Sequence, residues 1–482
     1  MGDLLRSLSV RFYLALGCAL VLLVLGFGVS GLLGLLGRAL GSTALILFGL
    51  VPLLCLLLGL FYRVFGLLRP TPPWRDPIPA ARFAPTVRLS YPEHEEQPAW
   101  ARQPSPHAGT LREFIRQNDL PDDVDDTKLR IGIVLSGGGA KGVYQAGALQ
   151  ALWEFLEREH ALQYVRVVAG TSIGAWNALF WLTQQVGDQS LRDWWASATP
   201  QKLVGPTVYV PFLRNYVLHT HPWQAQFPIL FGARADALLA GGPPFFYFTR
   251  TNVPQARLEL TTNHLPTDPY YGVDTSGYVI RGPIVDEPKG HYRVTDFADL
   301  ERAVFTSMDI PPAFPRLPGP SGDPCEDGGV IDNLPVRFTT WFEGCNLLFV
   351  FPLNASFAGT ASAHSILLRM FRVMDVRQGA LEHGALHGIS LYNRLIEGKQ
   401  NVNRQMHIKP VTTFCLCPAA PLDINTFAFW QTQAHGPAAF TLTYEATKAE
   451  LARFDFSITN HEVWMGQVGH QGAIRYKDFT LR

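Results

Sequence analysis

Two glycine-rich segments of this chain contain the residue types that acyl transfer requires. Residues 131–142 read I-G-I-V-L-S-G-G-G-A-K-G, and residues 170–174 read G-T-S-I-G. A glycine-rich turn exposes backbone N–H groups that can stabilise an oxyanion. A Gly-x-Ser-x-Gly sequence at the end of a strand forms a sharp turn that presents the serine hydroxyl as a nucleophile. The two segments therefore predict the two halves of an acyl-transfer site.

The same glycines also satisfy a nucleotide-binding pattern. Gly137, Gly139 and Gly142 follow G-x-G-x-x-G between a predicted strand and a predicted helix. A dinucleotide site needs a carboxylate at the end of the second strand, where residues 170–172 read G-T-S instead. A P-loop needs serine or threonine after its lysine, whereas Lys141 is followed by glycine. The residue types therefore favour acyl transfer over nucleotide binding.

A serine nucleophile needs a base, and the sequence offers two kinds. An α/β-hydrolase uses an acidic residue and then a histidine, both after the serine. Six of the later histidines do not lie in recognisable short loops after strands: His364, His383, His387, His435, His461 and His470. The other candidate is Asp327, which precedes two glycines. Taken alone, that aspartate is more typical of a turn.

Four motifs taken together resemble those of the patatin-like phospholipase family. They are G-G-G-A-K-G at 137–142, G-T-S-I-G-A at 170–175, T-S-M-D-I-P-P-A-F-P at 306–315, and D-G-G at 327–329 followed by Asn333 and Pro335. The motifs occur in the family's order within residues 128–354. Met308 and Asp309 replace small residues that are often found there, and Asp332 precedes Asn333.

This resemblance implies a Ser–Asp dyad without histidine, in which Ser172 is the nucleophile and Asp327 the base. The backbone N–H groups of Gly137, Gly138 and Gly139 would stabilise the oxyanion. The remaining motif residues would support these turns: Lys141, Gly142, Gly170, Gly174, Gly328 and Gly329. A carboxylate with a reference pKa of ~3.9 is a weaker base than an imidazole at ~6.5. Burial of Asp327 would recover part of the difference by raising its pKa.

Alternating strand and helix patterns predict an α/β fold. Apolar runs at 129–135 and 164–169 alternate with helical spacing at 142–159 and 173–185, as in a parallel sheet with helical crossovers. Further strands are predicted at 244–251, 258–262 and 347–352, and helices at 365–400 and 436–453. We therefore expect a three-layer α/β/α sandwich, with a central and mostly parallel sheet, over residues 128–455. Residues 456–482 are expected to be a C-terminal tail.

An aromatic-rich segment at 194–231 interrupts this alternation. Its aromatic side chains could line an acyl groove or dip into lipid, but aromatic residues are usually buried. The sequence therefore favours packing in the core.

The N-terminal 69 residues are predicted to form a two-helix membrane hairpin. Residues 12–36 and 42–62 carry no charge, and each exceeds the roughly 20 residues needed to span a bilayer. Five arginines flank the outer ends of the hairpin, whereas Arg38 stands alone in its turn. The positive-inside rule then places the catalytic region in the cytoplasm. Residues 70–127 contain a proline-rich stretch and are expected to be a linker.

The charge balance and the motifs together limit the classes of function. The 40 basic and 40 acidic residues balance, so no overall field favours nucleic acid. The dyad needs neither metal nor cofactor, and the expected partners are a membrane lipid substrate and the bilayer. The leading hypothesis is a membrane-anchored serine hydrolase that cleaves carboxylic esters of glycerophospholipids. A neutral-lipid or lysophospholipid hydrolase, an acyltransferase, and a catalytically idle lipid-binding scaffold remain as alternatives.

Overall fold

A computed structural model describes the folded part of the chain. The described residues are 109–118, 129–206, 216, 218–264, 272–273, 279–280, 290–354, 366–398, 411–418, 422, 424, 426–427, 429–456, 460–465 and 475–478. The chain divides into two units, one of residues 1–91 with 361–373 and one of residues 92–360 with 374–482. The strands that carry the predicted site belong to the second unit, as do residues 374–398 of the helix that begins at Ile366.

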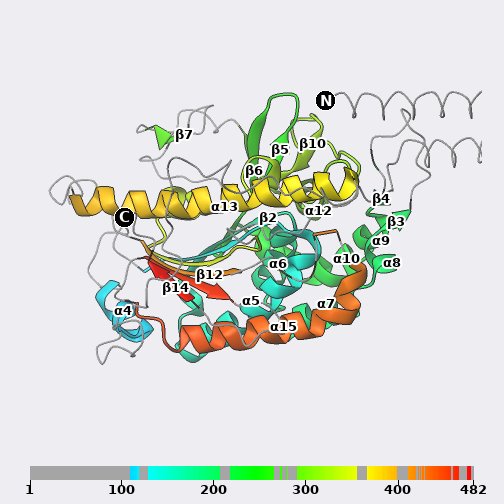
Figure 1. The fold of residues 1–482 in the computed structure, drawn as a ribbon. Helices are drawn as coiled ribbons and strands as arrows, with labels where there is room; N and C mark the ends of the chain where they lie inside the picture. The colour runs from blue at the N-terminus through cyan, green and yellow to red at the C-terminus, as the bar shows by residue number, and fades with distance from the viewer. Residues whose placement is uncertain are drawn as a thin grey trace, which may run out of the picture. The chain divides into compact units, whose positions relative to one another are not determined.

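A ten-stranded mixed sheet forms the centre of that unit, in the order β14-β13-β12-β11-β1-β2-β5-β6-β9, with β10 paired to β5 (Figure 1). The strands are β1 (Ile131–Leu135), β2 (Val165–Thr171), β5 (Phe245–Asn252), β6 (Arg257–Thr262), β9 (His291–Arg293), β10 (Cys325–Asp327), β11 (Leu347–Phe351), β12 (Thr412–Pro418), β13 (Asn460–Met465) and β14 (Arg475–Asp478). Among these strands the pairing is parallel except at β5/β6, β5/β10 and β13/β14. The prediction of a mostly parallel sheet is confirmed.

Helices cover both faces of this sheet. The longer helices are α4 (Leu111–Asn118), α5 (Gly142–Arg158), α6 (Ile173–Leu182), α7 (Ser190–Ser197), α12 (Phe297–Ser307), α13 (Ile366–Gly398) and α15 (Phe429–Leu451). Figure 1 shows α13 on one face and α5, α6 and α15 on the other. Successive side chains of a strand point to opposite faces of the sheet. On β1, Ile133 and Leu135 therefore join one apolar core and Val134 joins the other.

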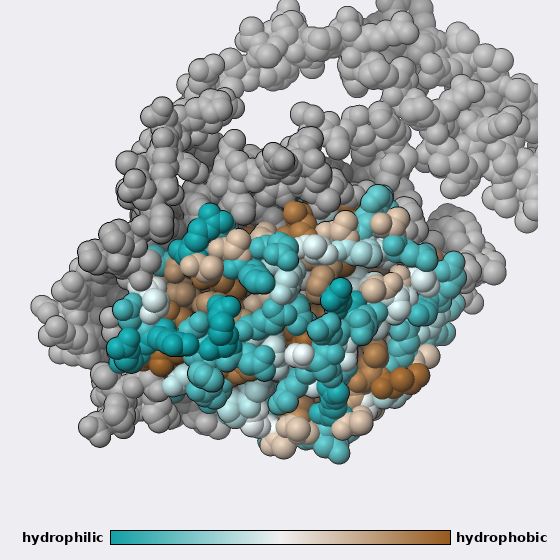
Figure 2. Space-filling view, turned by 90° about the horizontal axis from the view of Figure 1, so that it is seen from below, coloured by the Kyte–Doolittle hydropathy of each residue, from teal (hydrophilic) through white to brown (hydrophobic). Residues whose placement is uncertain are grey.

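Shorter elements complete the described chain. They are the helices α8 (Pro200–Leu203), α9 (His221–Gln224), α10 (Phe227–Phe231) and α11 (Ala235–Leu239), and the two-stranded pairs β3 (Gly205–Pro206) with β4 (Leu218–His219) and β7 (Gly272–Val273) with β8 (Val279–Ile280). The face seen from below α15 is polar over most of its area, with small separate apolar patches (Figure 2).

The aromatic segment packs inward, as the sequence favoured. Trp176, on α6, lies at the centre of a cluster of aromatic rings. Its neighbours Trp194, Trp223, Phe227 and Phe231 are all buried. This cluster fixes the helix that follows Ser172 against the core.

The C-terminal residues extend the sheet further than the sequence indicated. β12 pairs in parallel with both β11 and β13, and β14 closes that edge in antiparallel orientation. The sheet therefore continues into residues 456–482, the segment predicted to be a tail.

The predicted membrane hairpin, at 12–36 and 42–62, lies outside the described residues. The same is true of most of the predicted linker at 70–127. Within the part of the chain that the structure describes, no helix is long and apolar enough to cross a membrane.

Candidate active site

Ser172 occupies a strained turn between β2 and α6. Its φ of 54° and ψ of −125° lie in a region that residues with a side chain seldom adopt. The surrounding structure holds it there: the Ser172 N–H donates to Ser307 Oγ at 2.8 Å, and its carbonyl accepts from Ala175 N at 2.9 Å. The strand–turn–helix context predicted for G-T-S-I-G is confirmed. The turn also places Ser172 at the positive N-terminal end of α6.

Two of the predicted glycines make this turn possible. A Cβ on Gly170 would lie 2.6 Å from the carbonyl carbon of Gly174, and a Cβ on Gly174 would lie 2.5 Å from the carbonyl oxygen of Leu135. Any side chain at either position would therefore push α6 away from the ends of β1 and β2.

Strand pairing brings Asp327 to the same place. β2 runs parallel to the first half of β5, and its last residue, Thr171, pairs with Thr249. β10 runs antiparallel to the second half of β5, and its last residue, Asp327, pairs with Arg250. β6 occupies the opposite edge of β5 from Phe248 onward, so β2 and β10 must share one edge. The C-terminal ends of β2 and β10 therefore meet head to head.

The space at this junction is filled by small groups. Thr171 Oγ1 and Thr249 Oγ1 are 2.6 Å apart, and a Cβ on Gly328 would lie 2.1 Å from Thr249 Oγ1. The predicted residues Ser172, Asp327 and Gly328 are thus brought together, although 155 positions separate Ser172 from Asp327 in the chain.

Asp327 is a buried carboxyl with one oxygen held and one available. Its Oδ1 accepts from Gly329 N at 2.7 Å, while Oδ2 has no partner in full hydrogen-bond geometry. Burial raises the pKa of Asp327 to about 7, and hydrogen bonding from Ser172 and from the Gly329 amide opposes that rise. Ser172 is therefore within reach of the carboxyl, though their contact is loose. Loose contacts of this kind are usual before a substrate tightens a catalytic pair.

The glycine turn lies beside Ser172. A Cβ on Gly137 would lie 3.0 Å from Ser172 Cβ, and the Gly137 N–H donates to the Asn333 carbonyl at 3.3 Å. Among the described residues, the N–H groups of Gly138 and Gly139 meet no hydrogen-bond acceptor. Gly139 has a φ of +56°, and a Cβ there would lie 2.1 Å from the Thr426 carbonyl oxygen. Of the three glycines predicted to bind an oxyanion, Gly138 and Gly139 thus have uncommitted donors.

The last two predicted support residues on this side of the site pack around the turn in different ways. Gly142 lies against Ile173, where a Cβ would be 2.4 Å from Cγ1. Lys141 is buried, and its Nζ donates to Asn354 Oδ1 at 2.8 Å and to Asp375 Oδ1 at 3.1 Å. Its positive charge is therefore committed to side chains beneath the turn.

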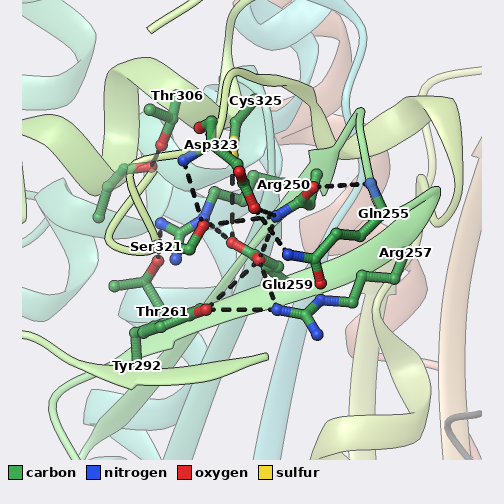
Figure 3. Close-up of polar contacts among 12 residues, drawn as sticks. Arg250, Gln255, Arg257, Glu259, Thr261, Tyr292, Thr306, Ser321, Asp323 and Cys325 are labelled. Carbon is green, nitrogen blue, oxygen red and sulfur yellow. Dashed lines mark hydrogen bonds and ion pairs between the residues drawn. The ribbon is translucent and has the colours of Figure 1, made fainter. Parts of the chain in front are cut away.

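A buried ionic network supports the loop that leads to Asp327 (Figure 3). Arg250 Nε donates to Glu259 Oε2 at 3.1 Å, and its Nη1 donates to Thr261 Oγ1 at 2.6 Å. Asn252 Nδ2 donates both to Glu259 Oε1, at 2.7 Å, and to Asp323 Oδ2, at 2.9 Å. The network therefore joins β5 and β6 to the residues just before β10.

Sequence reasoning missed this network, although the strands carried a signal. F-F-Y-F-T-R-T-N and R-L-E-L-T-T each have a charged residue, Arg250 or Glu259, between apolar and hydroxyl-bearing neighbours. Arg250 and Glu259 are both buried, so each charge needs the other. Ser307, whose hydroxyl holds the Ser172 amide, lay in a recognised motif without an assigned role.

Asp309, one of the departures from the family pattern, is buried beside β10. Its carbonyl accepts from Asp327 N at 3.0 Å, and its Oδ2 accepts from Leu317 N at 3.0 Å. Burial raises the pKa of Asp309 well above its usual range, with additional repulsion from Asp327 and Glu326. The folded state therefore favours the neutral acid.

Asp309→Asn should consequently make the protein more stable at alkaline pH. A carboxyl whose folded pKa is raised binds more protons in the folded state, so wild type loses stability as pH rises above the unfolded pKa of about 4. The neutral amide removes that loss while keeping an acceptor for Leu317. Urea unfolding at acid and alkaline pH should show a flatter pH dependence for the variant. An unchanged difference between the two pH values would show that folding does not raise the pKa of Asp309.

Comparison with known proteins agrees with this geometry. The family model described as patatin-like phospholipase matches residues 133–339, which contain Ser172, Asp327 and the glycine turn. Residues 133–339 form a patatin-like phospholipase domain. This is a lipid acyl hydrolase domain, as the motifs predicted. No match was found among curated proteins.

Two solved structures show weak similarity to this chain. VipD from Legionella pneumophila aligns with 68% of this chain and 67% of its own, at 15% identity and a TM-score of 0.32. Human GIVD cytosolic phospholipase A2 aligns with 51% of this chain and 43% of its own, at 16% identity and a TM-score of 0.26.

Proposed function

We propose that this patatin-like chain hydrolyses carboxylic esters of phospholipids through an acyl-enzyme intermediate on Ser172. The observation that carries the proposal is the meeting of β2 and β10 beside β5. It sets a serine in a strained turn next to a buried carboxyl whose pKa is about 7. A serine hydroxyl needs a base that is ionised near neutral pH and is more basic than an ordinary carboxylate. Asp327 has both properties.

In the first half-reaction, Ser172 Oγ attacks the ester carbonyl carbon and transfers its proton to the Asp327 carboxylate. The carbonyl oxygen becomes an oxyanion, which the N–H groups of Gly138 and Gly139 stabilise. When the tetrahedral intermediate collapses, the ester C–O bond breaks. Asp327 returns its proton to the leaving alkoxide, which departs as the alcohol portion of the lipid.

In the second half-reaction, water takes the place of that alcohol. Asp327 removes a proton from the water as its oxygen attacks the acyl carbonyl, and the same two amides stabilise the new oxyanion. The intermediate then releases a fatty acid, and the proton held by Asp327 returns to Ser172 Oγ. Both half-reactions use one carboxyl as base and then as acid, so no histidine is required.

Fluorophosphonate trapping combined with lipid hydrolysis tests this proposal. The probe forms a covalent bond only with an activated serine, so purified wild type should label at one site. Peptide mass analysis should locate that site at Ser172. Mixed phosphatidylcholine–detergent micelles should then yield free fatty acid and lysophospholipid, and prior labelling should stop their release. A folded protein that labels elsewhere, or not at all, would rule the mechanism out.

We further propose that residues 12–36 and 42–62 anchor the enzyme to the membrane. The support is their length and their lack of charged residues. Anchoring would raise the local concentration of bilayer substrate around the catalytic domain.

Substituting arginine for Leu25 and Leu54 together should release the protein from membranes. An arginine near the centre of a spanning helix costs roughly 2.5–3.5 kcal/mol on the insertion scale. Carbonate-washed membranes should retain wild type and a Pro98→Arg control, whereas the double variant should appear in the supernatant. Equal retention of all three proteins would exclude the hairpin as the anchor.

A further inference from the structure

Glu382, on α13, is a buried carboxylate that holds two asparagines beneath the glycine turn. Its Oε1 accepts from Asn333 Nδ2 at 2.6 Å and from Asn354 Nδ2 at 2.8 Å. Its Oε2 accepts from the backbone N–H of Asn354 at 3.1 Å. Glu382 and Asn333 are both buried, so these contacts are shielded from water. All three hydrogen bonds have the same side chain as their acceptor, so Glu382 fixes both asparagines relative to α13.

Asn333 connects Glu382 directly to the glycine turn. Besides contacting Glu382, its Nδ2 donates to the Gly137 carbonyl at 3.2 Å, and its own carbonyl accepts from Gly137 N at 3.3 Å. One residue therefore contacts both the N–H and the carbonyl of Gly137. Because both amide hydrogens of Asn333 have acceptors, Glu382 also fixes which way that side chain faces.

Asn354 constrains the middle of the turn. It follows Leu353, whose side chain lies 2.7 Å from the position that a Cβ on Gly138 would occupy. The Oδ1 of Asn354 accepts from Lys141 Nζ at 2.8 Å. Glu382 therefore holds Asn354, which is the partner of Lys141 and directly follows the residue that packs against Gly138.

A second carboxylate of α13 holds the far end of the turn. Asp375 lies seven positions before Glu382, close to two helical turns, so both side chains are on the same face of α13. Asp375 Oδ1 accepts from Lys141 Nζ at 3.1 Å and from Thr426 Oγ1 at 2.8 Å. The carbonyl of Thr426 accepts from Ala140 N at 2.9 Å.

From these contacts we infer that Glu382 and Asp375 are positioning residues for the oxyanion-binding amides. Glu382 acts through Asn333 and Asn354, and Asp375 acts through Lys141 and Thr426. Neither carboxylate touches Ser172 in the described contacts, so their effect reaches the reaction only through the placement of the Gly138 and Gly139 amides. This inference rests on the proposed function, because it assigns a role within the same acyl-transfer site.

Glu382→Gln is the sharpest test, because it preserves size and turns one acceptor oxygen into a donor. The amide can still accept from two groups at one end, but its NH₂ then faces a donor. We expect kcat for p-nitrophenyl butyrate, and the rate of fluorophosphonate labelling, to fall about 10- to 100-fold, since small displacements of catalytic groups have effects of this size. KM should remain close to that of wild type, because the ester contacts none of the substituted atoms.

The double variant Glu382→Gln/Asn333→Ala distinguishes positioning from general destabilisation. If Glu382 acts through Asn333, the loss in kcat of the double variant should be clearly smaller than the product of the losses in the two single variants. Glu450→Gln is the matched control, because Glu450 is a buried carboxylate on α15 and should leave kcat unchanged. If Glu382→Gln does not fold, Asp375→Asn replaces it, with an expected loss of several-fold in kcat at constant KM.

The possible results distinguish failure of the positioning role from failure of the proposed function. Wild-type labelling at Ser172 with unaltered kcat in both folded α13 variants would overturn the inference and leave the proposed function intact. Fully multiplicative losses in the double variant would also overturn it. A folded wild type that shows no labelling at Ser172 would instead overturn the proposed function, and the positioning role with it.

Discussion

Ser172→Ala is expected to reduce ester hydrolysis to background and to abolish fluorophosphonate labelling. Alanine keeps the Cβ and the backbone but removes the atom that forms the acyl-enzyme. Loss of a serine nucleophile typically lowers kcat by roughly 10⁶-fold in enzymes of this chemistry. The residual rate then comes from the oxyanion-binding amides and from substrate binding alone.

The fold should survive this substitution. The amide of residue 172 still donates to Ser307 Oγ, and alanine experiences the same positive φ as serine. Circular dichroism and thermal unfolding should therefore match wild type, and Ser197→Ala, at an exposed serine on α7, should retain full activity. Substantial turnover by a folded Ser172→Ala protein would mean that a different residue is the nucleophile.

Asp327→Asn is expected to have the second-largest effect, a loss of about 10²- to 10⁴-fold in kcat, because general-base catalysis contributes on that scale. The amide occupies the same volume, and its oxygen can still accept from Gly329 N. It cannot take the serine proton. Stopped-flow measurements should show that Ser172 of the folded variant reacts slowly with the fluorophosphonate probe at every pH.

The wild-type pH profile should identify the same group. Asp327 must be ionised to act as a base, so kcat/KM should rise with pH and level off above its pKa of about 7. Glu382 has a pKa raised by burial to about the same value, so the inflection alone does not name the residue. Glu382→Gln should keep the inflection at a lower rate, whereas Asp327→Asn should lose it. The reverse pattern would assign the base to Glu382 and reject Asp327.

The stability effect of Asp327 has the opposite sign to its catalytic effect. Because its folded pKa is raised above the unfolded value, ionisation costs stability, and this cost grows as pH rises from about 4 towards 7. The pH range in which the site becomes active is therefore the range in which it destabilises the fold.

Local patterns predicted the elements that carry the site. Glycine turns, apolar strand runs and helical spacing depend on nearby residues, so β1, α5, β2, α6 and β5 lie close to where the sequence placed them. The turn that carries Ser172 was predicted for the same reason, whereas Asp327 was predicted as the base only because four motifs together resemble one family.

Local patterns could not predict contacts between segments that are far apart in the sequence. Glu382 lies on a helix whose sequence shows no motif, and its partners Asn333 and Asn354 are 49 and 28 positions away. The joining of β12, β13 and β14 to the sheet likewise depends on pairing between remote segments. The predicted hairpin, at 12–36 and 42–62, lies outside the described residues.

In the proposed mechanism, the head-to-head arrangement of β2 and β10 would separate catalysis from substrate choice. The spacing between serine and carboxyl is set by the hydrogen-bond ladder of β5, and ladder geometry varies little from protein to protein. Connecting loops, by contrast, tolerate insertion and exchange. Under the proposed mechanism, lipid preference would change through loop sequence, over evolutionary time or by deliberate grafting, while the sheet keeps the spacing between Ser172 and Asp327.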